Sequence, residues 1–357
     1  MKSVLRQPRF WLVIGIVVTT VGLIRFIDIL YGSNTFEGDA ERAIYVSRGQ
    51  TFASIVDTLE TCGIIRNRSE FVFVGKLLGG AGRMQIGKYV VSSGISNYDL
   101  FTMIRDGRGV RLISVTIPEG LRARSHARIL ARTVGLDSAR FVEMVYDNEF
   151  TRSLGIEAHS LEGYLLPETY GFYWQPDEKD VIIRLVDQFK KVYTDSLQER
   201  AQGLGWTTAQ VMTLASIVEG ETVLGEERET ISGVYHNRLR KRMPLQADPT
   251  IQYMIEDGPR RVLYSDLKLD HPYNTYRNRG LPPGPVNNPG KASILAALYP
   301  VRHNYLFFVA NGKGGHWFST NFEDHKRHVR QFRRNRRLEL RATAQNGQGP
   351  SSDLRRN

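Results

Sequence analysis

Two glutamates close a helical pattern in the middle of the chain. Residues 207–250 read TTAQVMTLASIVEGETVLGEERETISGVYHNRLRKRMPLQADPT, and apolar residues recur there at helical spacing, at Val211, Leu214, Ala215 and Val218. Glu219 lies at one edge of this expected buried face and Glu221 at the other. A carboxyl group at the margin of an apolar stripe is half desolvated, which raises its pKa toward the range of a general acid. Periodicity does not choose between the two.

The helix that positions these carboxylates begins at Thr207 or Thr208, since either can supply the N-cap. Gly220 and Gly225 are expected to loosen its end. A second helical pattern follows, with one face shared by Glu227, Ile231, Val234 and Tyr235, so another carboxylate points inward. The alternative role of these acids is structural, because glutamates near helix starts favour the helix dipole and half-buried acids are often paired.

Composition limits the classes of protein to consider. A chain of 357 residues with 41% hydrophobic residues predicts two to three domains with folded cores. The formal charge of +11 predicts an anionic neighbour, which is nucleic acid, a lipid headgroup or an anionic polymer. A single cysteine, Cys62, excludes an intramolecular disulfide and a cysteine-rich metal site. No metal site is expected, because the histidines lack compact spacing with an acid, at His316, His325 and His328.

The amino-terminal residues predict a membrane anchor. An uncharged run from Phe10 to Ile24 extends in apolar character to Tyr31, past Arg25 and Asp28, which are spaced to pair at i,i+3. No small-x-small cleavage site follows, so we expect an uncleaved transmembrane helix over 10–31 rather than a signal peptide. Basic residues before the run and acidic residues after it place residues 1–9 in the cytoplasm and the rest outside it. For the basic run at 326–337, that side of the membrane favours anionic lipid or wall polymer over nucleic acid, although a solvated helix face remains the simpler alternative.

The remaining patterns predict an α+β organisation. Residues 43–108 contain two strand-then-helix units, with strands at 43–46 and 89–91, and form a small module for binding or spacing. A mixed α+β domain then spans 110–337, and its predicted strands are 110–117, 305–309 and 316–319. Of these, the strand at 305–309 is expected to be buried. The last segment, 338–357, has few apolar residues and is predicted to be disordered.

Segments rich in Pro, Gly and Asn flank the central helices and carry polar and aromatic groups suited to a polyhydroxylated ligand: Gln246, Asp248, Tyr273, Asn274, Thr275 and Tyr276. A second segment, SLEGYLLPETYGFYW, adds Glu162, Glu168 and the aromatic residues Tyr164, Tyr170, Tyr173 and Trp174. These aromatics form either a platform for stacking on sugar rings or part of the core. The polar residues could equally tie the loops to the helix pair.

Several separated motifs occur in one order along the chain: IPEG (117–120), LEGYLLPETY (161–170), LASIVEGET (214–222), ER (227–228), NRL (237–239), LQADPT (245–250), YNTY (273–276) and GLPPGP (280–285). Together they resemble the MltG-type (YceG-like) endolytic lytic transglycosylases of bacterial cell-wall metabolism, from about Ala43 to His328. The family's catalytic glutamate falls on Glu219, which settles the choice against Glu221. Gly220, which follows it, departs from the charged or bulkier residue expected there and should soften the helix locally.

The resemblance implies cleavage of the β-1,4 bond between N-acetylmuramic acid and N-acetylglucosamine in peptidoglycan, with a 1,6-anhydro end, no cofactor, and termination of nascent glycan strands. It implies a LysM-like module at 43–108, a catalytic helix pair within 110–337, a single-pass protein of the bacterial cytoplasmic membrane, and cell-wall synthases as partners. Residues expected to orient Glu219 or hold the sugars are Glu227, Gln246, Asp248, Tyr273, Asn274, Thr275, Tyr276 and Glu168. Two rival classes are a non-catalytic peptidoglycan-binding scaffold and a pyridoxal phosphate-dependent lyase; against the latter, Lys313 lies in a tight glycine-rich turn.

Overall fold

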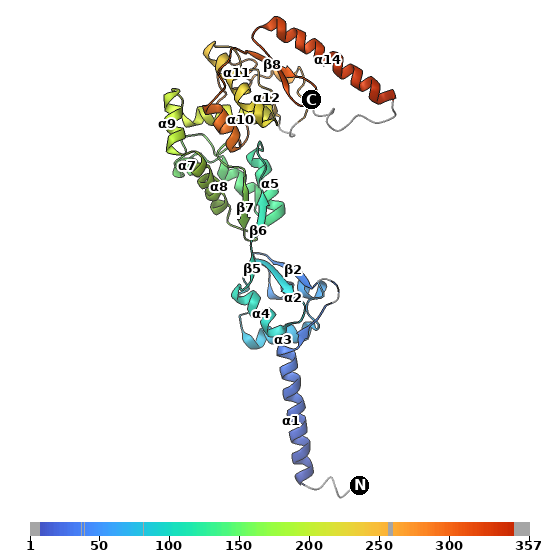
Figure 1. Ribbon diagram of the computed structural model, residues 1–357. Helices are drawn as coiled ribbons and strands as arrows, with labels where there is room; N and C mark the ends of the chain where they lie inside the picture. Colours follow the sequence, from blue (N-terminus) through green and yellow to red (C-terminus); the bar gives the residue numbers. More distant parts are fainter. Residues whose placement is uncertain (1–7, 37, 39, 81, 256–259, 346–357) are drawn as a thin grey trace. The chain divides into compact units, whose positions relative to one another are not determined.

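The computed structural model describes residues 8–36, 38, 40–80, 82–255 and 260–345 and shows a mixed α+β chain (Figure 1). Two units can be distinguished. The first comprises Met1–Val115 with the short segments Arg132–Leu136 and Gly171–Pro176, and the second comprises the rest. These two short segments join the first unit although they follow the predicted boundary at residue 110 in sequence. Residues 1–7 of the predicted cytoplasmic segment lie outside the described residues.

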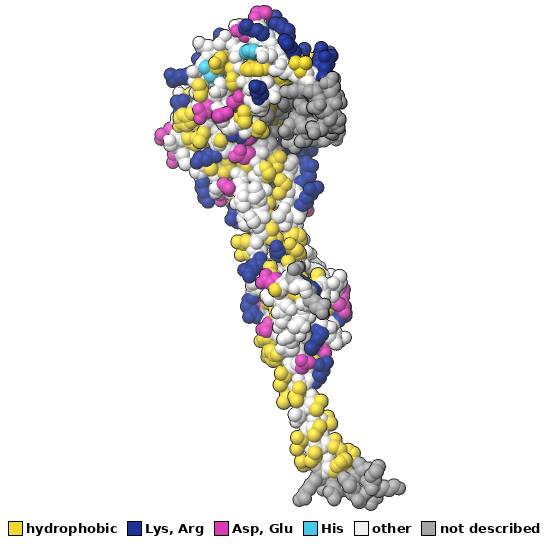
Figure 2. Space-filling model, turned by 45° about the vertical axis from the view of Figure 1, so that its right-hand side comes forward, with side chains coloured by type: hydrophobic (Ala, Val, Ile, Leu, Met, Phe, Trp, Pro, Cys, Tyr) yellow, Lys and Arg dark blue, Asp and Glu magenta, His cyan; other side chains and the backbone are white. Residues whose placement is uncertain are grey.

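The apolar amino-terminal run forms α1 (Pro8–Tyr31). Its stretch Phe10–Tyr31 has a mean hydropathy of 2.2 and is long and apolar enough to cross a membrane. Hydrophobic side chains cover this helix in Figure 2. Arg25 pairs with Asp28 at 2.6 Å, as their i,i+3 spacing predicts, and with Glu70 at 2.7 Å. The carboxyl end of α1 therefore has polar partners in the first unit and buries Leu30 in its core, while most of the helix before Asp28 is exposed.

Among its described residues, the first unit contains after α1 a three-stranded antiparallel sheet of order β2-β3-β5, the two-stranded pair β1-β4 and three further helices. Its elements after α1 are β1 (Ser33–Asn34), β2 (Glu41–Val46), α2 (Phe52–Thr61), α3 (Arg68–Leu78), β3 (Gly87–Ser92), β4 (Ile95–Ser96), α4 (Asn97–Asp106) and β5 (Val110–Arg111). The predicted strands and the first and last helices are confirmed. The core lies between sheet and helices and contains Val56, Phe71, Tyr89 and Phe101, all at most 1% exposed.

The strand predicted over 110–117 is wrong as a single element. It divides into β5, which pairs with β3, and β6 (Ile113–Thr116), which pairs with β7 (Thr169–Phe172). The alternation of apolar residues continues through both strands, so the sequence pattern does not reveal that the hydrogen-bonding partner changes at Leu112.

The second unit is mainly helical. Its helices are α5 (Ala123–Val134), α6 (Ser138–Val145), α7 (Asn148–Ser153), α8 (Glu178–Val192), α9 (Asp195–Gly203), α10 (Thr208–Glu221), η2 (Gly225–Glu227), α11 (Arg228–Arg240), α12 (Asp248–Met254), η3 (Asp266–Lys268), α13 (Lys291–Leu298) and α14 (Phe322–Gln345). Helix α10 packs against α11, α12 and α13. Thr207 caps it in a capping box with Gln210, so the predicted start is confirmed. All residues from Val211 to Val218 are buried, so the expected single apolar face is wrong: a central helix is covered on every side.

A two-stranded hairpin, β8 (Phe307–Ala310) and β9 (His316–Ser319), precedes the final helix. The predicted buried strand at 305–309 is only half-buried as β8, because a two-stranded sheet covers few of its own residues. Helix α14 packs on this hairpin through Phe322, whose ring lies 5.7 Å from that of Phe307. The helix continues through residues 338–345, which were predicted to be disordered; the rest of that segment lies outside the described residues.

Candidate active site

Glu219 lies in the last turn of α10 with a side chain that is 6% exposed. The backbone N–H of Gly290 donates a hydrogen bond to Oε2 at 3.0 Å, and the Arg228 guanidinium, from the start of α11, lies 3.3 Å from Oε1. These donors stabilise a carboxylate. The burial of Glu219 therefore results from its position at the end of a central helix beside polar partners, and not from the margin of an apolar stripe.

A second carboxylate, Glu119, shares the same guanidinium. It belongs to the IPEG turn, its side chain is 47% exposed, and it lies 3.7 Å from Arg228 Nη2. Partial burial and the negative charge of Glu219 raise the pKa of Glu119, Arg228 lowers it, and Glu168 raises it further. In the sequence, IPEG is recognisable as a motif, but Glu119 is not among the predicted site residues. The signal that could have indicated Glu119 is a glutamate held in a Pro-Glu-Gly turn between a strand and a helix.

Two glycines allow these carboxylates to approach the backbone. Gly120 has φ of +74°, and a Cβ there would lie 3.4 Å from Glu219 Cγ. A Cβ on Gly290 would lie 1.8 Å from Glu119 Oε1, so any side chain at that position displaces Glu119. The N–H of Gly290 therefore contacts the Glu219 carboxylate, and its Cα lies against the Glu119 carboxylate.

Asn288 fixes the segment that leads to Gly290. This fully buried residue accepts hydrogen bonds from Gly163 N at 2.8 Å and Leu165 N at 3.1 Å through Oδ1. Its Nδ2 donates to Glu162 Oε1 at 2.8 Å and to the Leu121 carbonyl at 3.0 Å. This one side-chain amide joins the segment 287–290 to residues 162–165 and to Leu121, which follows the IPEG turn.

We expect Asn288→Ala to reduce the free energy of unfolding by roughly 3–5 kcal/mol, because buried donors of Gly163 and Leu165 and the Glu162 carboxyl lose partners. Chemical denaturation followed by circular dichroism measures the loss. The control is Asn278→Ala, an exposed amide that donates to the His271 carbonyl at 2.9 Å and should cost at most about 1 kcal/mol. Equal stability losses in the two variants would contradict this role of Asn288.

Glu221 lies on a different side of the same helix end. Tyr235 donates a hydrogen bond from its hydroxyl to Glu221 Oε1 at 2.6 Å. Burial raises the pKa of Glu221 to about 7, with a further increase from the charge of Asp248, whereas Tyr235 and Arg238 act in the opposite direction. Tyr276 in turn donates to Asp248 Oδ1 at 2.6 Å. These contacts link α10, α11 and α12 beside Glu219.

The raised pKa of Glu221 predicts a pH-dependent stability. Because the folded-state pKa exceeds the usual value of 4.5, the protonated Glu221 carboxyl stabilises the folded chain fully below pH 4.5. This stabilisation is lost as the pH rises through about 7. The loss is on the order of 3 kcal/mol. Glu221→Gln cannot ionise and keeps an acceptor for Tyr235, so its Tm relative to the native chain should increase more at pH 8.5 than at pH 5. An identical Tm difference at both pH values would contradict the prediction.

Some of the other predicted site residues are exposed, and others are buried and form hydrogen bonds within the fold. Gln246, Asp248 and Glu168 are exposed. Gln246 precedes α12 and Asp248 is its first residue, while the Glu168 carbonyl accepts from Ile117 N in the IPEG turn. Asn274 and Thr275 are buried: Asn274 donates to the Leu267 and Leu269 carbonyls, and Thr275 Oγ1 accepts from Ala247 N at 3.0 Å. These two side chains tie loops together, which was the alternative to sugar binding.

Glu227 also has a structural partner. Its carboxylate bonds to His316 Nδ1 at 2.6 Å and accepts from His316 N at 2.8 Å, which joins η2 to β9. A Cβ on Gly315 would lie 2.7 Å from Glu227 Oε1, so the hairpin backbone closes over the carboxylate. The structure therefore does not bring Glu227 into contact with Glu219.

The aromatic residues of the LEGYLLPETYGFYW segment do not form one exposed platform. Tyr164 and Tyr170 are 1% and 5% exposed and belong to the core. Tyr173 is 55% exposed, and the Trp174 ring packs on Tyr45 with centroids 4.6 Å apart. The core interpretation is thus confirmed for Tyr164 and Tyr170.

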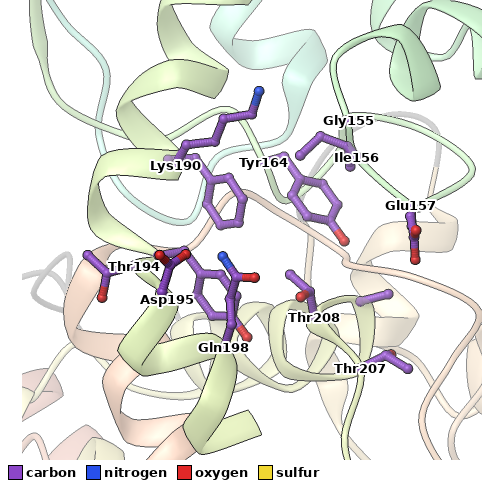
Figure 3. Close-up of a pocket in the computed structure, with 13 residues that line it drawn as sticks. Gly155, Ile156, Glu157, Tyr164, Lys190, Thr194, Asp195, Gln198, Thr207 and Thr208 are labelled. Atoms are coloured by element: carbon purple, nitrogen blue, oxygen red, sulfur yellow. The ribbon is translucent and has the colours of Figure 1, made fainter. Parts of the chain in front are cut away.

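Two adjoining cavities lie near the amino end of α10. Figure 3 shows the first, of about 520 Å³, with Lys190, Asp195 and Gln198 among its lining side chains. The second, of about 650 Å³, shares its edge at Gly155, Ile156, Glu157 and Ala209 and includes Tyr273. Glu219 lines neither cavity. The surface at the carboxylate pair is instead formed around Glu119, whose side chain is partly open to solvent.

Comparisons with known proteins give a consistent result. The model of the YceG-like family matches residues 44–331. A protein of Bacillus subtilis (strain 168) named endolytic murein transglycosylase is 30% identical over 319 residues, covering 84% of this chain and 88% of that protein. One of the same name from Streptococcus pneumoniae serotype 2 is 29% identical over 329 residues, covering 82% of this chain and 59% of that protein. A crystal structure of a YceG-like protein from Listeria monocytogenes matches with a TM-score of 0.59 at 30% identity, covering 81% of this chain and 99% of that one.

Proposed function

Because the chain belongs to the YceG-like family, we propose that it is an endolytic murein transglycosylase that cleaves the N-acetylmuramic acid to N-acetylglucosamine bond within peptidoglycan strands. The observation that supports this most directly is the carboxylate pair at the end of α10. Glu219, 6% exposed, and Glu119, 47% exposed, contact the same Arg228 guanidinium at 3.3 and 3.7 Å.

The proposed reaction needs one proton donor and one proton acceptor, and no water. The carboxyl of Glu219 donates its proton to the glycosidic oxygen while positive charge develops at the muramyl C1, which the substrate's own N-acetyl group stabilises. The C1–oxygen bond breaks, and the Glu219 carboxylate then takes the proton of the muramyl 6-hydroxyl as that oxygen bonds to C1. Attack within one sugar gains up to roughly 7–11 kcal/mol from proximity. The products are a 1,6-anhydro end and a free N-acetylglucosamine 4-hydroxyl.

The carboxylate pair explains how a proton is kept for this reaction. Two carboxylates face one guanidinium, so full ionisation would leave one negative charge uncompensated in a partly desolvated site. In this site partial burial and the negative charge of Glu219 raise the pKa of Glu119, so that carboxyl keeps its proton above its usual range. The raised pKa of Glu119 agrees with this arrangement. Glu119 therefore acts as a positioning residue that holds a proton beside Glu219, while the Gly290 N–H and Arg228 stabilise the carboxylate that Glu219 becomes once it has donated its own proton.

The assignments for the rest of the chain are part of the same proposal. Residues 43–108 act as a LysM-like module, and the domain at 110–337 carries α10 and α11 as the catalytic helix pair. Gln246, Asp248, Tyr273, Tyr276 and Glu168 contact the sugars. Helix α1 anchors the protein in the bacterial cytoplasmic membrane with residues 1–9 in the cytoplasm, where its length and apolar composition match a lipid bilayer. Cell-wall synthases are the proposed partners, and cleavage terminates nascent strands.

Incubation of the full chain in detergent with purified sacculi, followed by mass spectrometry of the soluble products, tests the function. We expect muropeptides with new 1,6-anhydro ends. A membrane-anchored, non-catalytic scaffold is the second candidate, and it would bind the sacculi without producing new ends.

A further inference from the structure

A cationic cleft of about 900 Å³ lies between α9, α11 and residues 300–304. Its charged lining residues are Arg200, Arg240 and Arg302, together with His236 and His303, and its lining includes no Asp or Glu. By contrast, three other cavities in the described part of the chain each contain at least one carboxylate. Positive charge is therefore concentrated in this cleft without local compensation.

The arginines are available to a ligand. Within the described ranges, none of the three forms an ion pair with a carboxylate. Arg200 donates from Nε to the Leu298 carbonyl at 3.1 Å, and Arg240 donates from Nη2 to Asn237 Oδ1. These bonds fix the side chains at one nitrogen each and leave other guanidinium N–H groups for recognition.

The cleft also has an aromatic wall. The Trp206 ring stacks on His236 with centroids 4.6 Å apart and an interplanar angle of 10°. Burial lowers the pKa of His236, the hydrogen bond to the Ala297 carbonyl raises it, and the charges of Arg240 and Arg200 lower it further. A flat aromatic surface thus lies in the same cleft as the three arginines.

Guanidinium groups recognise planar oxyanions through paired N–H donors, and an uncompensated cluster of them attracts anions. We propose that this cleft binds the carboxylates of the short peptides attached to peptidoglycan strands, an inference that rests on the proposed function. Its volume lies in the range of pockets that enclose a drug-sized ligand and exceeds what one inorganic oxyanion fills.

The position of the cleft fits a peptide attached to a sugar near Glu219. Arg228 contacts Glu219 at the amino end of α11, whereas His236 and Arg240 lie about 12 and 18 Å farther along this helix. Helix α13 spans the same interval, from the Gly290 N–H on Glu219 to the Leu298 carbonyl on Arg200. An extended peptide of four or five residues spans about 13–18 Å. The reach of such a peptide matches the separation of the two sites.

Direct binding tests the proposal. The probe is the free tetrapeptide released from peptidoglycan by an amidase, titrated calorimetrically into the full-length protein in detergent. Doubly substituted Arg240→Gln/Arg302→Gln protein should bind it at least tenfold more weakly, and the same peptide with amidated carboxyl groups should lose affinity for the native chain to a similar extent. Arg277→Gln, an exposed arginine outside the cleft, serves as the control with unchanged affinity.

The outcomes distinguish a peptide carboxylate from a phosphate as the bound anion, and they test the peptide site separately from the proposed transglycosylase function. Unchanged affinity in the double variant, or equal binding of the amidated peptide, would overturn the assignment. Displacement of the peptide by inorganic pyrophosphate at equal concentration would also overturn it and identify a phosphate site. Because binding is measured without turnover, it remains informative if the native chain releases no anhydro ends. Unchanged Tm of the double variant shows that a lost affinity is not a loss of folding.

Discussion

Glu219→Gln is expected to lower the rate of 1,6-anhydromuropeptide release from purified sacculi at least about 10³-fold, within the contribution of a general acid–base group. An amide neither donates a proton to the glycosidic oxygen nor removes one from the 6-hydroxyl. The substitution keeps the shape of the side chain, and its carbonyl oxygen still accepts from the Gly290 N–H, which lies 3.0 Å from Oε2 in the native chain. Chromatography with mass spectrometry measures release.

Glu221→Gln is the matched control, since it makes the same chemical change two residues away. Its carboxyl bonds to Tyr235 rather than to Arg228 or Gly290, so at pH 6 the variant should release products at close to the native rate. Native-like circular dichroism of both variants excludes unfolding as the cause. Release by the Glu219→Gln variant at the native rate would remove this residue from its proposed role.

Glu119→Gln is expected to reduce kcat/KM at pH 7 by about 10- to 100-fold and to remove from the alkaline limb of the pH profile the ionisation of Glu119, whose pKa is raised in the native chain. The charged groups that face Glu119 are Glu219 from α10, Arg228 from α11 and Glu168 before β7. Without the second carboxylate, the negative charge of Glu219 faces Arg228 with no competing anion. The amide at residue 119 also has no proton to lose, so the ionisation of Glu119 no longer contributes to the fall in rate as the pH rises.

The pH profile distinguishes a role in proton retention from a structural role. Glu119 packs on the Cα of Gly290, so a merely structural loss would lower the rate equally across the pH range and leave the limb in place. That result would contradict a role of Glu119 in holding a proton. Glu168→Gln is the control, because this exposed carboxylate makes a smaller contribution to the pKa of Glu119 than Glu219 does. Its kcat/KM should fall, because Glu168 is proposed to contact the sugars, but the alkaline limb of its profile should lie at the native pH.

Local sequence signals located the helix that carries Glu219. The Thr207 cap and the apolar spacing after it predict α10 correctly, since both depend on residues within two turns of one another. The expected single buried face failed because α10 lies among three other helices. Similarly, Gly220 does not soften the helix: it remains helical, and a Cβ there would lie 2.7 Å from Pro249, so close packing explains the glycine.

Long-range contacts explain what the sequence could not show. Glu119 and Gly290 lie 100 and 71 positions from Glu219, and no periodic pattern links such residues. The buried Asn288 likewise joins segments up to 167 positions apart. The sequence identifies Asn274 and Thr275 as polar residues of a loop. Only the structure shows that their side chains form hydrogen bonds with other parts of the fold rather than facing a ligand.

Digestion of sacculi in water enriched in oxygen-18 tests the central claim most directly. If the Glu219 carboxyl closes the ring from the muramyl 6-hydroxyl, the native chain will release 1,6-anhydro ends without the heavy isotope, and Glu219→Gln will release almost none. Reducing ends that carry oxygen-18, or equal release by both proteins, would contradict the account.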